Sequence, residues 1–153
     1  PGGGEYWVTT TELTRELPMA QQLNPYITFA GNCSEAMDFY GAVLGGTVTK
    51  MTFRESGMDA DGIMHASLDT ATGFHIFASD TAEGMAPFNP GTNLQISLSG
   101  DDPEALRGYW DGLSDGARVV VPLEKQMWGD VYGQLVDKFG IAWHVNIADP
   151  TDA

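Results

Sequence analysis

Three histidines and one cysteine are the side chains of this 153-residue chain with the clearest capacity for chemistry. An imidazole titrates near neutrality, so His65, His75 and His144 could act as general bases or metal ligands. Cys33 lies near an expected helix start, where a thiolate would be stabilised. Because the sequence places no histidine beside it, we expect Cys33 to be a passive thiol.

Composition limits the classes of partner. The net charge of −14 argues against nucleic-acid binding, which needs basic surface. It would draw cationic small molecules toward a cleft, the alternative being an acidic surface that serves only solubility. No apolar run approaches the roughly 20 residues of a membrane span, so we expect no membrane partner. A single cysteine rules out an internal disulfide framework and favours a cytoplasmic location.

The sequence pattern of a strand followed by a helix occurs twice in the chain. Polar residues alternate with Leu94, Ile96 and Leu98, which predicts a strand over 92–99, and an acidic cap with Pro103 opens a helix over 102–113. A shift of 69 positions (104 − 35) places this pattern on an earlier one. The same shift aligns Glu104-Ala105-Leu106 with Glu35-Ala36-Met37, Tyr109 with Tyr40, and Trp143-His144-Val145 with Phe74-His75-Ile76. These matches indicate a duplicated module, each with a capped helix, Asn32 and Asp101 being the expected caps.

Each module is predicted to run strand, helix, strand, strand, strand. The first has strands at 24–30, 47–53, 63–69 and 73–79 and a helix at 32–44; the second has strands at 92–99, 118–123, 133–137 and 141–147 and a helix at 102–113. We therefore divide the chain into a leader or added peptide (1–18), a first module (19–80), a linker (81–91), a second module (92–148) and a tail (149–153).

This twice-repeated order resembles the vicinal oxygen chelate superfamily of glyoxalases, bleomycin resistance proteins and extradiol dioxygenases. Local motifs are similar to its PhnB-like branch: Gly31-Asn32-Cys33, Phe39-Tyr40, Leu44-Gly45-Gly46, Met64-His65-Ala66, Trp128-Gly129 and Asp137-Lys138-Phe139-Gly140. The resemblance implies an α+β fold in which two βαβββ modules curl an open mixed sheet around a cleft, with the helices outside. It also implies a homodimer.

The resemblance also implies four metal-ligand positions, on the first and last strands of each module. They fall on Asn24, His75, Asn93 and His144. A slip of one residue in the first strand would put Pro25 in place of Asn24, and a slip in the fourth would move that position off His75. Carboxylates are absent from this set, and amides are poor ligands for zinc or iron. We therefore expect no tightly bound cofactor, with a weakly held divalent metal as the alternative.

Other residues predicted to face the cleft would serve an organic ligand. They are Tyr26, Thr28, Phe53, Phe77, Gln95 and Trp128, whose rings could stack on a flat or apolar molecule. Trp110 and Trp143 share faces with residues that pack under the helices and are predicted to be core. His65 is a weak candidate for a general base, the structural alternative being a bond to a backbone carbonyl.

Two functions follow from these residues. The first is the binding of a small aromatic or cationic molecule in the cleft, without a tight metal. The second is a metal-dependent lyase, isomerase or dioxygenase in which the ion polarises a substrate oxygen. A metal-free catalyst using His65 is a third, weaker hypothesis.

Overall fold

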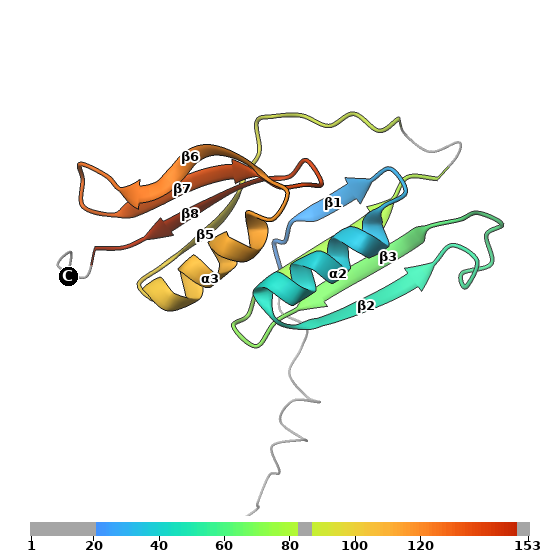
Figure 1. Ribbon diagram of the computed structural model, residues 1–153. Helices are drawn as coiled ribbons and strands as arrows, with labels where there is room; N and C mark the ends of the chain where they lie inside the picture. Colours follow the sequence, from blue (N-terminus) through green and yellow to red (C-terminus); the bar gives the residue numbers. More distant parts are fainter. Residues whose placement is uncertain (1–20, 83–86, 150–153) are drawn as a thin grey trace, which may run out of the picture.

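The computed structural model describes residues 21–82 and 87–149, and within them two modules of the predicted order (Figure 1). The predicted leader, residues 19–20 of the predicted first module, residues 83–86 of the predicted linker and the last four residues lie outside this range. The first module contains β1 (Tyr26–Phe29), α2 (Cys33–Leu44), β2 (Thr47–Thr52), β3 (Ile63–Asp69) and β4 (His75–Asp80). The second contains β5 (Ile96–Gly100), α3 (Pro103–Leu113), β6 (Arg118–Lys125), β7 (Val131–Val136) and β8 (Ala142–Ile147).

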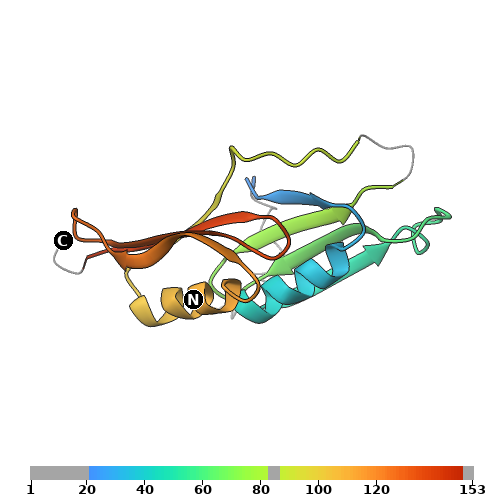
Figure 2. The same ribbon diagram turned by 45° about the horizontal axis from the view of Figure 1, so that its top comes forward.

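Each module forms its own four-stranded sheet, ordered β1-β4-β3-β2 and β5-β8-β7-β6. The first strand of each module pairs in parallel with the last, and the remaining pairs are antiparallel. Both helices lie along one side of the two sheets, and residues 87–95, which lead into the second sheet, pass along the opposite side (Figure 2). The α+β fold of two βαβββ modules is thus confirmed. No helix among the described residues is long and apolar enough to cross a membrane.

The helices begin differently from one another. The Asp102 side chain caps α3 by accepting a hydrogen bond from the Ala105 N–H at 3.1 Å, one residue after the cap predicted at Asp101. Asn32 occupies the predicted N-cap position of α2, but its side chain makes no capping bond. Buried Asp80, at the end of β4, accepts from the N–H groups of Gly31 and Cys33 instead, each at 2.9 Å. A carboxylate 47 residues away therefore satisfies backbone donors that a local cap would otherwise serve.

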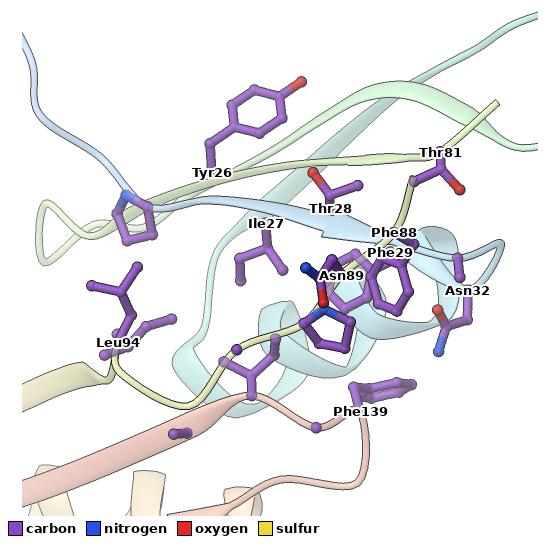
Figure 3. A pocket seen from close by; sticks show the side chains of 18 of the residues that line it. Tyr26, Ile27, Thr28, Phe29, Asn32, Thr81, Phe88, Asn89, Leu94 and Phe139 are labelled. Carbon is purple, nitrogen blue, oxygen red and sulfur yellow. The ribbon is translucent and has the colours of Figure 1, made fainter. Parts of the chain in front are cut away.

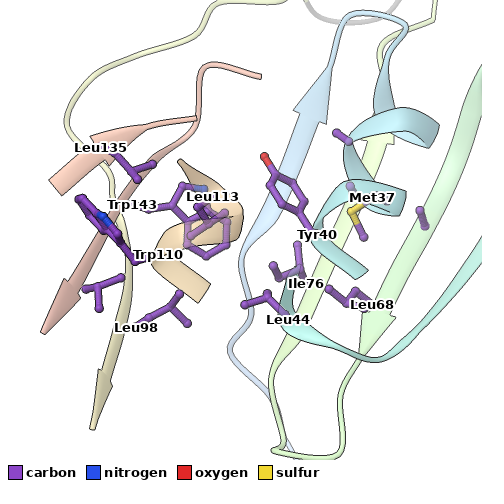
Figure 4. Packing of buried hydrophobic residues seen from close by; sticks show 14 of the residues in the cluster. Met37, Tyr40, Leu44, Leu68, Ile76, Leu98, Trp110, Leu113, Leu135 and Trp143 are labelled. Atoms are coloured by element: carbon purple, nitrogen blue, oxygen red, sulfur yellow. The ribbon is translucent and has the colours of Figure 1, made fainter. Parts of the chain in front are cut away.

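One hydrophobic core runs through both modules (Figure 4). Its largest fully buried side chains include Trp143, Tyr40, Met37 and Leu113, which come from both helices and from β8. Trp110 is also buried, so both tryptophans predicted to be core are confirmed. Removing so much apolar surface from water is the main force that holds the two halves together.

Buried Asp137 joins the modules through polar contacts. One carboxylate oxygen accepts from the N–H groups of Phe139 and Ile141, which shapes the turn between β7 and β8. The other accepts from the Tyr40 hydroxyl at 2.6 Å and from the Trp143 indole N–H at 2.9 Å. Because Tyr40 belongs to α2, this oxygen links the first module to the second.

The repeat offset is not constant along the chain. The hydrogen-bond register opposes Tyr26 to Phe77 in the first sheet and Ser97 to His144 in the second. The strands β4 and β8 correspond at a shift of 67 (142 − 75), because the five-residue turns before them have the same hydrogen bonds. His144 is therefore equivalent to Phe77, and the predicted equivalence of His75 and His144 is wrong.

Candidate functional site

An aromatic and imidazole cluster covers the open face of the first sheet, on the side away from α2. The Tyr26 hydroxyl lies 3.2 Å from Nδ1 of His65, and the two ring centroids are 5.8 Å apart. The Phe77 ring lies 5.6 Å from His65 and 6.5 Å from Tyr26. The hydroxyl of Tyr26, and not a backbone carbonyl, is thus the hydrogen-bond partner of His65. Tyr26 is 54% exposed, so the cluster presents a ring to solvent.

His75 lies farther along the same face, opposite Asp69. Its Nδ1 is 2.6 Å from Oδ1 of that carboxylate. A carboxylate at this distance orients an imidazole and leaves the other ring nitrogen available, the arrangement that orients many metal-bound and catalytic histidines.

The open face of the second sheet carries a second cluster. His144 Nδ1 lies 3.1 Å from the Gln95 side-chain oxygen and 3.4 Å from the Tyr132 hydroxyl. The Trp128 ring, 57% exposed on the loop between β6 and β7, lies 6.4 Å from Tyr132. His65 with Phe77 and Tyr132 with His144 occupy equivalent places, with centroids 5.6 and 5.5 Å apart. Each module therefore holds one imidazole against one aromatic ring at equivalent positions. In the first module the histidine is on β3 and the ring on β4, whereas in the second the ring is on β7 and the histidine on β8.

A pocket of about 1250 Å³ lies where the two modules meet (Figure 3). One wall is β1, a second combines the start of β5 with the turn before β8, and the third is the connecting segment at residues 87–91. Ile27, Leu94 and Phe139 project around the space, whereas Tyr26 and Thr28 project from the other side of β1. Among the described residues, no Asp, Glu, Lys, Arg or His lines this pocket, although the chain carries a net charge of −14.

The predicted ligand-binding residues are divided between these places. Tyr26, Thr28 and Gln95 line the pocket, and Phe77 and Trp128 lie on the two open faces. Phe53 is only 2% exposed, so it belongs to the interior and cannot offer its ring to a ligand without movement. Sequence reasoning missed Phe88 and Phe139, which line the pocket from the connecting segment and a turn, where strand alternation gives no signal.

The four predicted metal ligands do not come together within the chain. His75 and His144 lie on different sheets with different partners, and Asn24 donates to the Gln22 side chain at 3.0 Å. None of the four, Asn93 included, lines the pocket. A metal site from these residues stays a prediction, but the equivalence of His75 and His144 in the two modules no longer supports it.

Cys33 is buried at the start of α2. Burial, and secondarily the charge of Asp80, raises the pKa of its thiol to about 12. The thiolate is therefore scarce at neutral pH, and the geometry offers the thiol no role in the candidate site.

Comparisons with known proteins define the class. Residues 22–145 match the model of the Glyoxalase/Bleomycin resistance protein/Dioxygenase superfamily. The chain is also 30% identical to protein YjdN of Escherichia coli K12 over 142 residues, covering 82% of this chain and 94% of YjdN. The chain therefore belongs to this superfamily.

Solved structures agree with this assignment. Protein PA1353 of Pseudomonas aeruginosa superposes with a TM-score of 0.77 at 34% identity, covering 85% of this chain and 99% of that one. A PhnB protein of Bacillus cereus superposes with a TM-score of 0.69 at 21% identity, covering 84% and 100%, which supports the PhnB-like resemblance at the level of fold. The fosfomycin resistance protein FosX of Listeria monocytogenes, solved with Mn(II), shares the fold at 9% identity and a TM-score of 0.57, covering 88% and 98%.

Proposed function

We propose that this protein binds a small, uncharged aromatic molecule where the two modules meet, without a tightly held metal. The observation that carries the proposal is the pocket itself, which is large, apolar and free of charged lining residues within the described chain. Natural ligand sites have volumes of about 300–1,000 Å³ and mostly apolar walls, so this larger space has room for a drug-sized molecule.

Tyr26 supports an aromatic ligand. Its backbone lines the pocket while its half-exposed ring lies on the adjoining open face against Phe77. A flat group leaving the pocket would meet this ring, and such a contact contributes about 0.5–1.5 kcal/mol beyond its buried area. The described residues that line the pocket include no carboxylate to pair with the predicted cationic ligand. The acidic surface would therefore attract such a ligand only at long range.

Binding of N-phenyl-1-naphthylamine, a neutral probe whose fluorescence rises in apolar surroundings, tests the proposal. We expect saturable binding that Leu94→Ala weakens roughly threefold or more, because it removes an apolar side chain that projects around the pocket. Leu23→Ala is the matched control, since it removes a similarly exposed leucine that does not line the pocket. Equal losses in both variants, or no saturable binding, would reject the pocket as the site.

A second candidate function is metal-assisted catalysis, favoured by the surroundings of His144. Its position on β8, beside Gln95 and Tyr132, gives an oriented imidazole on an open sheet face. We also propose that the protein is a cytoplasmic homodimer; exposed Val119, Val120 and Met127 on and beside the edge strand β6 support an interface. Light scattering at working concentration tests the dimer.

A further inference from the structure

The four edge strands of the two sheets differ in how well they are protected against pairing with another chain. An exposed sheet edge invites another chain to pair with it, and proteins prevent this with charged residues, prolines and bulges. β2 contains Lys50 and a register shift, and β6 contains Arg118, Pro122 and Lys125 with two register shifts. β1 and β5 have no charged residue, no proline and no register shift.

The unprotected edge of β1 faces the pocket. The carbonyl oxygens of Pro25 and Phe29 accept hydrogen bonds from Phe77 and Thr81, so alternate residues point their backbone groups toward β4. The N–H and C=O groups of Tyr26 and Thr28 therefore point to the opposite edge. All the residues from 25 to 30 line the pocket, as expected when a strand presents its edge to a cavity.

β5 presents its edge to the same space. The Gly100 carbonyl accepts from the Ala148 N–H, so Ser97 directs its backbone groups away from β8. Gln95, Ile96 and Ser97 line the pocket opposite β1. Two unpaired strand edges thus border one cavity whose walls carry no charge among the described residues.

From these edges we propose that the ligand of this pocket is peptide-like: an extended, uncharged chain of amide groups with apolar side chains that pairs with β1. This inference rests on the proposed function, because it assigns the chemistry of the ligand in the same pocket. Strand addition of this kind draws affinity from backbone hydrogen bonds and specificity from side-chain pockets. Ile27, Leu94 and Phe139 would contact the apolar side chains.

The shape of the pocket favours a single extended chain over a second copy of the protein. The connecting segment at 87–91 closes the third side of the pocket. An edge strand of a folded copy brings its sheet and helix with it, whereas a free chain needs only the spacing of one strand, about 4.8 Å from its neighbour.

The test compares the capped neutral peptide acetyl-Val-Ile-Val-amide with an analogue in which an ester replaces the central amide. The ester lacks one N–H donor but keeps the shape, so we expect it to displace N-phenyl-1-naphthylamine about 2- to 10-fold less well. Saturating peptide should also slow hydrogen exchange at the Thr28 amide. These measurements use the unmodified protein and do not depend on any variant folding.

Two variants locate the pairing edge. Thr28→Pro removes the N–H that points into the pocket, at an edge position where proline is tolerated, and should weaken the peptide several-fold more than it weakens the naphthylamine. Thr28→Val keeps the N–H, so the peptide should lose clearly less affinity in this variant than in Thr28→Pro. Equal affinity for peptide and ester while the naphthylamine still binds would overturn the inference alone, and absence of naphthylamine binding would overturn the proposed function beneath it. Slow Thr28 exchange that depends on protein concentration without peptide would identify a second copy as the occupant and refute the inference.

Discussion

Replacing Tyr40 with Phe tests whether the contact between the modules contributes to stability. The hydroxyl donates to the Asp137 carboxylate at 2.6 Å, and both side chains are buried. Burial, followed by the charge of Asp137, raises the pKa of Tyr40, so the hydroxyl stays protonated and donating. A hydrogen bond to a charged acceptor contributes about 1.5–3 kcal/mol. Asp137 would keep three other donors, so we expect the free energy of unfolding to fall by about 1.5–2 kcal/mol.

Urea denaturation followed by circular dichroism measures this change. For a small domain whose stability falls by about 1–3 kcal/mol per M urea, the midpoint should drop by about 0.5–2 M. Tyr109→Phe is the matched control, because the Tyr109 hydroxyl has no hydrogen bond to another described residue; its effect should stay within about 0.5 kcal/mol. Asp137→Asn should cost more than Tyr40→Phe, since an amide nitrogen would face a donor. Equal midpoints for the two tyrosine variants would refute the role of this hydrogen bond.

Three further predictions concern other buried or titratable groups. Asp80→Asn should lower the free energy of unfolding by about 2–3 kcal/mol, whereas Asp102→Asn, a cap of equal quality, should change it by less than about 1 kcal/mol; thermal melting compares them. Because the folded pKa of Cys33 is raised to about 12 from 9.0, its contribution to stability is complete below pH 9.0 and falls as pH rises from there toward 12. Urea denaturation between pH 8 and 10 should show a decline that Cys33→Ala reduces; a decline of the same slope in both proteins would exclude the thiol. Added zinc should bind weakly by calorimetry and be lost in acid, since only a neutral imidazole binds a metal, so tight stoichiometric zinc abolished by His144→Ala would favour the metal-dependent function instead.

The fold could be predicted because its signals are local. Alternation in 92–99, Pro103 with an acidic cap, and the paired Gly45 and Gly46 each mark an element within a few residues. The cap on α2 could not be predicted in this way, since Asp80 reaches it only after β4 has been placed. For the same reason the pocket could not be predicted: strand alternation assigns Tyr26 and Thr28 to the open face of the first sheet, whereas the pocket lies along the edge of β1, and Phe88 and Phe139 are placed by a connecting segment and a turn.

The changing offset between the modules shows where a duplicated sheet can change in length. In the paired registers, equivalent residues are 71 positions apart in the first strands (97 − 26) and 67 apart in the last strands (144 − 77). The last residues of the two helices, Leu44 and Leu113, are 69 apart. These shifts differ because the connections between the elements differ in length in the two halves. A change of length in a connection moves the residue numbers without turning a strand over, whereas a slip of one residue in the pairing register would turn the core side of the strand outward. The two halves have therefore been free to gain or lose residues in their connections while the strand registers were kept, and a histidine in one half could come to occupy the place of a phenylalanine in the other while still facing the same way.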